Sequence, residues 1–200
     1  MNITAIKQQE RLKGRYSIYV DEKYVFSLSA DALLEQGLHN GQELDEQQLK
    51  AYKKLSADDK AYGLAIAYVA RRMRSRWELS DYFRRKGYDD DLSKQLLERL
   101  DRLGLVDDEK FAEAWVNTRR LLKSVSKRRL SQELKQKRIA DDIIEQVLSE
   151  DETDERAVLR ELIARKRKQS KYQDNLKLMQ YLARQGFSYD DIKSVLSELD

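Results

Sequence analysis

Four short clusters of carboxylates are the residues of this chain whose types and spacing could do chemistry. They are Asp89–Asp91, Asp107–Glu109, Asp141–Asp142 and Asp190–Asp191. Neighbouring carboxylates are typical ligands of the Mg²⁺ ions that nucleases use. Each cluster, however, falls where a predicted helix begins, and negative charge there complements the positive end of the helix macrodipole. We therefore expect the clusters to stabilise helix starts and not to hold a metal ion.

Other catalytic arrangements have little support. His39 is the only histidine, so a histidine-based triad or a multi-histidine metal site is excluded. The chain has no cysteine, which excludes a disulfide framework and cysteine-based metal sites. It also lacks the Gly-x-x-x-x-Gly-Lys-Ser/Thr loop of nucleotide hydrolases. We predict a protein that is not an enzyme and needs no cofactor.

Positive charge could act through non-covalent contacts instead, and it is gathered in three blocks. They lie at 71–86, 127–138 and 160–171, whereas the formal net charge of the whole chain is only +3. Separated basic blocks favour an extended anionic partner or an acidic groove of another protein. The alternative, that each block is an ordinary solvated helix face, stays open for any one block taken alone.

Aromatic side chains could add stacking on nucleic-acid bases. Most of them fall on the apolar faces of predicted helices, where core packing is the favoured role: Trp77, Tyr82, Phe83, Phe111, Trp115 and Tyr181. Tyr16, Tyr19 and Tyr24 lie in predicted strands, and a small sheet leaves one face open. For these three tyrosines both roles stay open.

The bulk composition predicts a modular, helix-rich protein. Of the 200 residues, 38% are charged and 40% hydrophobic, and there is no proline. Ordinary domains are about 25% charged, so a large surface per residue is expected. No apolar run approaches the roughly 20 residues that cross a bilayer, and Met1–Glu10 lacks the apolar region of a signal peptide. We expect a soluble, cytoplasmic chain.

The first 55 residues differ from the rest. "ITAIKQ" and "RYSIYVDEKYVFSL" alternate apolar with polar residues, and Asp21–Lys23 supply a turn, which predicts a hairpin or small meander. A short helix then follows, with Ser29 at its N-cap and Gly37 past its end, and a second helix begins at Asp45. These residues are predicted to form a small α+β element.

The remainder has a helical period and repeats itself. Ser75 and Glu78 predict a capping box that opens a helix ending at Gly87. An offset of 51 brings the same pattern to Ser126 and Leu130, and an offset of 99 brings it to Asp174 and Leu178. The apolar positions expected to face inward in the first copy are Tyr62, Ile66, Val69, Met73, Leu79, Tyr82, Phe83, Leu92, Leu96, Leu100 and Leu103.

We therefore predict a mainly α fold, an elongated tandem array of three three-helix repeats behind the small N-terminal element. The expected domains are the N-terminal element at 1–55 and the repeats at 56–106, 107–150 and 151–200. Because the third helix of each repeat begins with acidic residues, which repel phosphates, sequence-specific reading of the DNA major groove is not expected. Phosphate attraction without base readout stays open.

With these repeats and caps in place, the sequence of the chain resembles those of the RecX regulatory proteins of bacteria. The resemblance covers nearly all of it, including "SKRRLSQELKQKRIADDIIEQVL", "LARQGFSYDDIKSVL" and, near the N-terminus, "RYSIYVDEKYVFSLSADALLEQGLHNGQEL". Its most specific residues are Arg72, Ser75, Glu78, Leu79, Lys86, Gly87, Gly104, Leu105, Asp107, Asp108, Phe111 and Ala112. Where the family commonly has glycine at the turn of its second repeat, this chain has Arg138, which implies a left-handed arginine.

The resemblance implies a non-enzymatic modulator of the RecA recombinase. Such proteins lie in the helical groove of the RecA filament on single-stranded DNA and inhibit filament extension, ATP hydrolysis, strand exchange and co-protease activity. We expect RecA as the partner, DNA as a second direct contact, no membrane, and a monomer. The alternative is a sequence-independent DNA-binding protein that acts without RecA.

Basic residues are the expected contacts, because they attract acidic groups of the filament or DNA phosphates. They are Arg71, Arg72, Arg74, Arg76, Arg84, Arg85, Lys86, Arg119, Arg120, Lys127, Arg128, Arg129, Lys135, Lys137, Arg138, Arg165, Lys166, Arg167 and Lys168. Apolar positions and glycines of the motifs are assigned to the fold.

Overall fold

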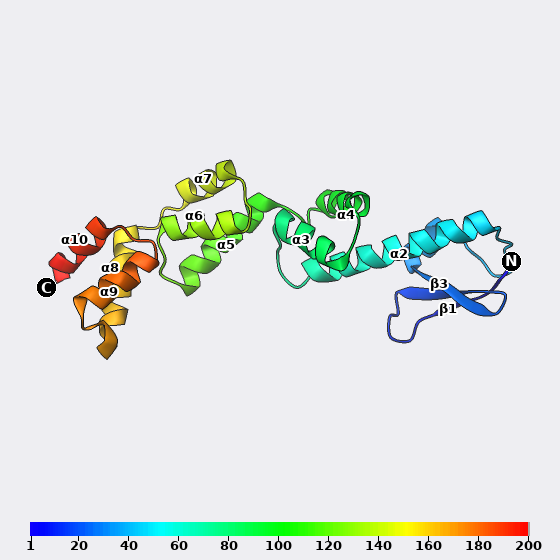
Figure 1. The fold of residues 1–200 in the computed structure, drawn as a ribbon, viewed down its shortest axis with the longest axis horizontal. Coiled ribbons are helices and arrows are strands. Elements are labelled where there is room, and N and C mark those ends of the chain that lie inside the picture. The colour runs from blue at the N-terminus through cyan, green and yellow to red at the C-terminus, as the bar shows by residue number, and fades with distance from the viewer. Residues whose placement is uncertain (200) are drawn as a thin grey trace. The chain divides into compact units, whose positions relative to one another are not determined.

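The three segments predicted as strands form one antiparallel sheet. In the computed structural model, which describes residues 1–199, β1 (Ile3–Gln8), β2 (Arg15–Val20) and β3 (Lys23–Ser29) pair in that order (Figure 1). The loop between β2 and β3 consists of Asp21 and Glu22, whose φ angles are 47° and 67°. Two positive φ angles give a turn that matches the right-handed twist of the strands. The predicted meander is confirmed.

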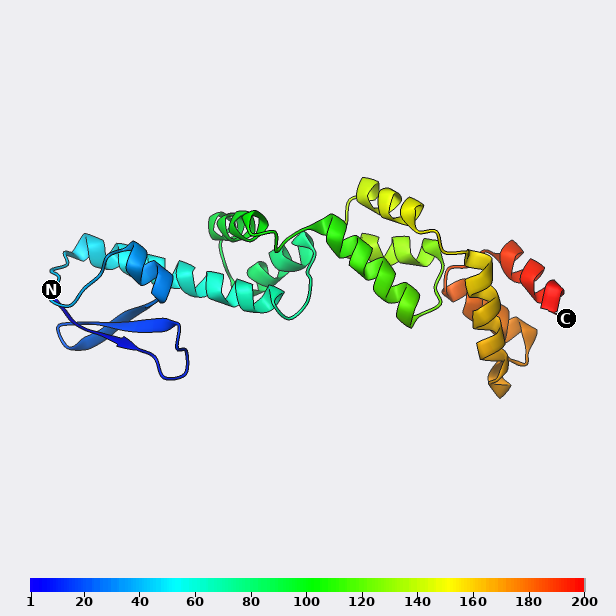
Figure 2. The ribbon, with the colours of Figure 1, turned by 180° about the vertical axis from the view of Figure 1, so that it is seen from behind.

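Two helices follow the sheet and lie on one side of it (Figures 1 and 2). α1 (Ala30–Glu35) is capped by the hydroxyl of Ser29, and α2 (Glu46–Val69) begins after Asp45, as predicted. The apolar side of the sheet faces these helices, with the Phe26 and Tyr52 rings stacked at 5.8 Å. Buried side chains of this core are Ile3, Ile18, Val20, Phe26, Leu28, Ala32, Leu38 and Leu44.

Side chains of α2 also satisfy the polar edge of β3. The Ser56 hydroxyl donates to the carbonyl of Ser27 at 2.6 Å, and the Asp59 carboxylate accepts from the backbone N–H and the hydroxyl of Ser29 at 2.9 and 2.6 Å. Arg15 on β2 pairs with the same carboxylate at 2.8 Å. An edge strand with satisfied hydrogen-bonding groups is protected from pairing with other chains.

One expectation about α2 was wrong. Met73 was predicted to continue its apolar face, but the helix ends at Val69 and Met73 is 46% exposed. The chain leaves the helix there because it must bring Ser75 to the N-cap of the next one. Periodicity shows which residues share a face but not where the face ends.

The rest of the chain is helical, and the chain divides into two units. The first comprises residues 1–72 and 89–98, and the second 73–88 and 99 onward. The further elements are α3 (Arg76–Lys86), α4 (Asp90–Arg102), α5 (Asp108–Leu122), α6 (Lys127–Gln136), α7 (Asp141–Glu150), α8 (Glu155–Arg167), the 3₁₀ turn η1 (Ser170–Tyr172), α9 (Asn175–Arg184) and α10 (Tyr189–Leu199). None of the helices within residues 1–199 is both long and apolar enough to span a membrane.

The second unit contains two separate apolar cores. One is formed by α5, α6 and α7 around Phe111, Ala112, Val116, Val125, Leu130, Leu134, Ile139, Ile144 and Val147. The other is formed by α8, η1, α9 and α10 around Leu159, Leu162, Ile163, Tyr172, Leu178, Leu182, Phe187, Ile192, Val195 and Leu196. The second and third repeats therefore each bury their apolar residues mainly within themselves, as expected for stacked modules.

Helix starts and turns follow the sequence closely. The side chains of Ser75, Ser126 and Asp174 accept hydrogen bonds from backbone N–H groups of the first turns of α3, α6 and α9. The acidic clusters also lie at helix starts, as predicted. Arg138 has a φ of 58°, which confirms the left-handed arginine in the second repeat.

Besides Met73, two further apolar residues expected to face inward do not. Leu103 is 56% exposed because α4 ends at Arg102 and the chain turns at Gly104, whose φ is 66°. Trp77 lies in the first turn of α3 and is 41% exposed.

Polar joints connect successive repeats. The hydroxyl of Ser75 donates to the carbonyl of Lys137 at 3.1 Å, and the hydroxyl of Ser126 donates to the carbonyl of Gln185 at 3.2 Å. Lys137 and Gln185 occupy equivalent C-caps, at the ends of α6 and α9. The start of the second helix of one repeat thus contacts the end of the second helix of the next. These joints determine how the basic residues of neighbouring repeats are presented.

Candidate protein and nucleic-acid interface

Three basic residues of the first repeat form the last turn of α3. Arg84 and Arg85 both pair with Asp81, and their side chains are 79% and 64% exposed. Lys86 is exposed and lies 5.7 Å from the centre of the Tyr82 ring. One carboxylate shared by two guanidinium groups leaves an excess of positive charge, which also suits the negative end of the helix macrodipole.

The second repeat exposes basic side chains at both ends of α6. Arg128 is exposed in the first turn. At the other end Lys135 pairs with Asp141 at 2.9 Å, with both side chains more than half exposed. Arg138 is exposed at the left-handed turn that follows. Arg129 is less accessible, because it packs along α6 with its guanidinium 3.5 Å from the Glu133 carboxylate.

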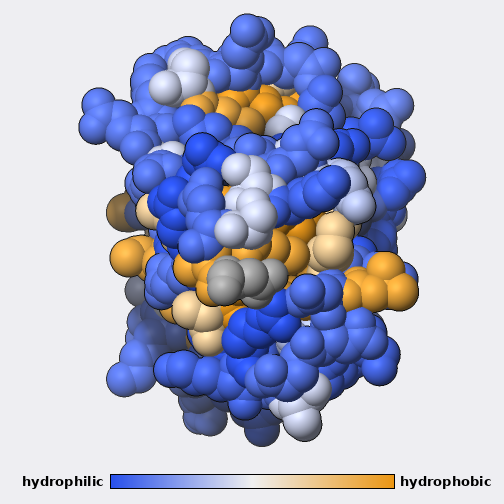
Figure 3. All heavy atoms as spheres, turned by 90° about the vertical axis from the view of Figure 1, so that its left-hand side faces the viewer, coloured by the Kyte–Doolittle hydropathy of each residue, from blue (hydrophilic) through white to orange (hydrophobic). Residues whose placement is uncertain are grey.

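In the third repeat the predicted cations lie in the last turn of α8 and at its C-cap. Arg165 and Lys168 are exposed, and Arg165 donates to the hydroxyl of Ser124 at 3.3 Å. Lys166 is half-buried, with its ammonium 4.6 Å from the centre of the Tyr181 ring. Arg167 donates to the carbonyl of Gln173 at 3.0 Å. Seen from the side of this repeat, the surface is mostly hydrophilic, with apolar side chains visible between the charged ones (Figure 3).

Further predicted cations lie between α2 and α3 and at the start of α3. Arg71 and Arg72 are exposed, and Arg74 is half-buried. Arg76, in the first turn of α3, pairs with Asp101 at 2.8 Å while its backbone N–H donates to Asp108 at 2.7 Å. Arg71 and Arg72 belong to the first unit, and Arg74 and Arg76 belong to the second.

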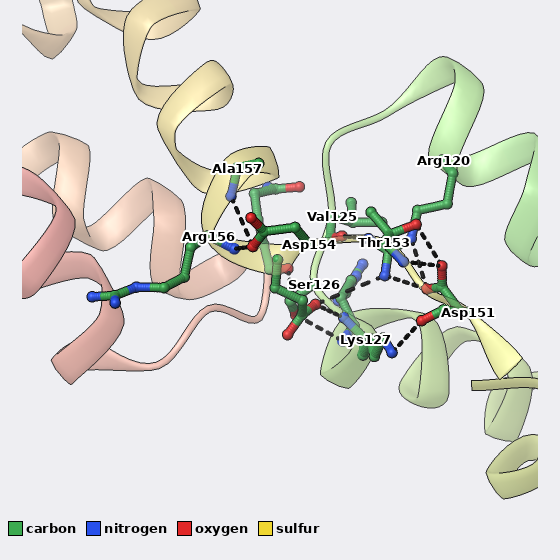
Figure 4. A network of polar contacts seen from close by, with 12 residues as sticks. Arg120, Val125, Ser126, Lys127, Asp151, Thr153, Asp154, Arg156 and Ala157 are labelled. Atoms are coloured by element: carbon green, nitrogen blue, oxygen red, sulfur yellow. Dashed lines mark hydrogen bonds and ion pairs between the residues drawn. The ribbon is translucent and has the colours of Figure 1, made fainter. Parts of the chain in front are cut away.

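Arg120 and Lys127 lie inside the joint between the second and third repeats (Figure 4). The Arg120 side chain is only 12% exposed, pairs with Asp151 at 2.6 Å and donates to the carbonyl of Val125 at 2.6 Å. The Lys127 ammonium donates to the carbonyl of Asp151, and its backbone N–H to the carboxylate of Glu155. These contacts hold the segments before α6 and before α8 together, and the charge of Arg120 is neutralised by Asp151.

The carboxylate of Asp151 is held in its charged form at this joint. Its burial tends to raise the pKa, but hydrogen bonds from Thr153 and Arg120 outweigh that effect, so the pKa of Asp151 lies below its ordinary value. The pair with Arg120 is therefore a charged contact at neutral pH.

Arg119 and Lys137 lie around Trp115, near the joint between the first and second repeats. The Arg119 guanidinium is 4.5 Å and the Lys137 ammonium 5.2 Å from the centre of the indole ring. Arg119 pairs with Glu133 at 2.7 Å, and Lys137 pairs with Glu78 of α3 at 2.6 Å. These two cations, like Arg120 and Lys127, stabilise contacts inside the second unit.

The sequence does not indicate that successive repeats are connected through Ser75, Ser126 and Gly186. The repeat pattern identified both serines as N-caps, but their hydroxyls make a second bond to a carbonyl some 60 residues away, which no local pattern reveals. Gly186 has a φ of 94°, and a Cβ built on it would lie 2.9 Å from the backbone nitrogen of Arg129. The one sequence signal for the contact at Gly186 is that the equivalent turn of the second repeat has Arg138 in place of glycine.

Models of RecX protein domains match most of the chain. The matching models are "Regulatory protein RecX N-terminal domain" over residues 1–45 and the first, second and third three-helix domains of RecX over 61–100, 107–148 and 153–196.

Curated relatives are similar over nearly the full length of this chain. "Regulatory protein RecX" of Bacillus licheniformis is 34% identical over 99% of this chain and 77% of its own length. The protein of the same name from Bacillus pumilus is 35% identical over 98% of this chain and 76% of its own length. That from Clostridium perfringens strain 13 is 30% identical over 98% of this chain and 95% of its own length.

Two solved structures have a similar fold. A crystal structure described as that of regulatory protein RecX superposes with a TM-score of 0.74 at 27% identity, and the match covers 98% of both chains. RecX from Lactobacillus salivarius gives a TM-score of 0.60 at 28% identity, covering 72% of this chain and 96% of that one.

Proposed function

Because this chain belongs to the RecX family of regulatory proteins, we propose that it binds the RecA filament on single-stranded DNA in its helical groove and inhibits RecA. Filament extension, ATP hydrolysis, strand exchange and co-protease activity then fall together, since each needs an intact filament. The protein acts by binding and catalyses no reaction of its own. RecA is a cytoplasmic partner, so the site of action is the cytoplasm.

The observation that carries this proposal is the match to all four RecX domain models, because it covers the N-terminal element and every repeat. The surface chemistry agrees with it. Each repeat exposes cations where a helix ends, at Arg84–Lys86, at Lys135 with Arg138, and at Arg165 with Lys168. Repeated positive charge fits a periodic, anionic partner.

The basic residues divide into two roles in this proposal. The exposed ones make electrostatic contact with acidic groups of RecA or with DNA phosphates: Arg71, Arg72, Arg76, Arg84, Arg85, Lys86, Arg128, Lys135, Arg138, Arg165 and Lys168. The cations within the joints, Arg119, Arg120, Lys127 and Lys137, act as positioning residues that present neighbouring repeats in a fixed order. Arg74, Arg129, Lys166 and Arg167 stay proposed contacts, with part of their charge already engaged in the fold or their side chains half-buried.

A binding comparison tests the proposal. Affinity is measured by fluorescence anisotropy for a labelled single strand, once naked and once coated with RecA and a slowly hydrolysed ATP analogue. We expect clear preference for the coated strand. The double variant Arg84→Glu with Arg85→Glu should bind it about tenfold more weakly, because charge reversal of exposed contacts costs about 1–2 kcal/mol.

The matched control is Lys193→Glu, which reverses an exposed charge on α10 outside the proposed surface. It should bind as the wild type does. Equal or tighter binding to the naked strand contradicts the proposal and favours a sequence-independent DNA-binding protein that acts without RecA.

A further inference from the structure

The side of the N-terminal sheet that faces away from α1 and α2 has no role in the function proposed above. The pairing register places Tyr19 opposite Tyr24 and Lys7 opposite Ser17, while the intervening Ile18 is fully buried on the helix side. Because side chains alternate along a strand, Lys7, Ser17, Tyr19 and Tyr24 share the opposite face. We call these four residues the open face.

The open face carries one cation, Lys7, and no carboxylate. The three strands together contain Lys7, Arg15 and Lys23 and no acidic residue. Arg15 is neutralised by Asp59 of α2. The nearest carboxylates in the sequence lie in the connections between strands, at Glu10, Asp21 and Glu22. The charge of the strands themselves thus favours an anionic ligand.

The two tyrosine rings of the open face contact each other, and the ring of Tyr24 is exposed. Tyr24 is 57% exposed, and its ring meets that of Tyr19 edge to face, with centroids 6.1 Å apart and planes at 75°. The ammonium of Lys7 lies 5.3 Å from the centre of the Tyr19 ring. Tyr19 is therefore supported on both sides, and it holds the Tyr24 ring in a defined orientation with much of its surface open. The exposed ring of Tyr24 thus has Lys7 nearby, beside the neighbouring Tyr19. Exposed rings on a sheet with cations nearby are the arrangement on which unpaired bases stack while the backbone phosphates lie near positive charge.

We propose that the open face binds single-stranded nucleic acid, with Tyr24 stacking on a base, Lys7 contacting a neighbouring phosphate and Tyr19 holding Tyr24 in place. Duplex DNA does not fit this role, because its bases are already stacked and paired. The site is independent of RecA and is additional to the basic helix ends.

The test uses the full chain without RecA and a fluorescently labelled oligothymidylate of about 20 nucleotides, enough to span a binding site of this type. Tyr24→Ala should weaken binding about tenfold, the effect expected when one base loses its stacking partner. Tyr24→Phe keeps the ring and should bind as the wild type does. Lys7→Gln should weaken binding and lower the slope of log affinity against log salt by about one.

The matched control is Tyr189→Ala, since Tyr189 is 63% exposed but lies at the start of α10. It should leave binding unchanged, and circular dichroism verifies that each variant keeps the wild-type melting temperature. The proposal is overturned if Tyr24→Ala binds like Tyr189→Ala, or if Tyr24→Phe is as weak as Tyr24→Ala. It is equally overturned if duplex DNA or polyglutamate displaces the oligothymidylate as well as an unlabelled single strand does.

Discussion

Ser126 and Gln185 are joined by two hydrogen bonds, because the backbone N–H and the hydroxyl of Ser126 both donate to the Gln185 carbonyl at 3.2 Å. The same hydroxyl accepts from the N–H of Arg129 at 3.1 Å. One serine therefore caps α6 and fastens the third repeat to the second. A carboxylate could do only the first of these, since it has no proton to donate.

Ser126→Asp should separate these two roles. Aspartate is an equally good N-cap, so any loss of stability reports the changed contact of this side chain with the Gln185 carbonyl. We expect a loss of about 1–2 kcal/mol, because the carbonyl loses a partner and gains a nearby negative charge. Urea unfolding followed by circular dichroism measures it. Asp174→Ser is the matched control at the end of the series of repeats and should change stability by less than about 0.5 kcal/mol.

Gly186→Ala should destabilise the chain more than Gly87→Ala. Both glycines follow the second helix of a repeat and have positive φ, 94° and 74°, so both variants incur backbone strain of about 1–2 kcal/mol. Only at Gly186 would the new methyl group overlap Ser126 and the backbone of Arg129, whereas nothing lies within 4 Å at Gly87. Urea unfolding compares the two. Equal losses would show that the close approach of the repeats is absent in solution.

Arg138→Gly should raise stability while weakening filament binding. The residue has a φ of 58°, which glycine adopts without the cost of about 1–2 kcal/mol that a side chain incurs. A gain of about 1 kcal/mol in urea unfolding is expected. Lys135→Gly, within the last turn of α6, should instead lose up to about 1 kcal/mol. Both variants remove an exposed proposed contact, so anisotropy with RecA-coated DNA should show weaker binding for each.

Asp151 should make stability depend on acidity. Its folded pKa lies below the ordinary value of 3.8, so the stabilisation is present above that value and is lost as pH falls through the lower, folded pKa. Asp151→Asn should therefore lower stability at pH 7 and flatten the acid limb of a plot of unfolding free energy against pH. An unchanged acid limb would mean that the Arg120 pair does not persist in solution.

The sequence allowed the local features to be predicted, because each is decided within a few residues. Ser75 and Ser126 are recognised as caps from their own turns, and Arg138 as left-handed from its place where glycine is expected. The predicted burial of Met73 and Leu103 was wrong, because the apolar spacing continues past the residues where α2 and α4 end. The burial of Arg120 could not be predicted from the sequence, because its partner Asp151 is 31 residues away.

Local sequence patterns were also insufficient to predict which basic residues form the candidate binding surface. Basic blocks are visible in a sequence, but Arg84 and Arg120 look alike there, although one side chain is 79% and the other 12% exposed. Only the packing of α5 against the following segments separates a surface cation from one that connects two repeats.

The rate of ATP hydrolysis by the cognate RecA on single-stranded DNA, with this protein added well below the RecA concentration, tests the central claim most directly. Strong suppression at such a ratio is predicted, because one bound molecule would stop many RecA subunits of the same filament. The double variant Arg84→Glu with Arg85→Glu should suppress hydrolysis less, and Lys193→Glu should match the wild type. Suppression that begins only when the protein saturates the DNA would contradict the account, because simple competition for the strand would then explain it.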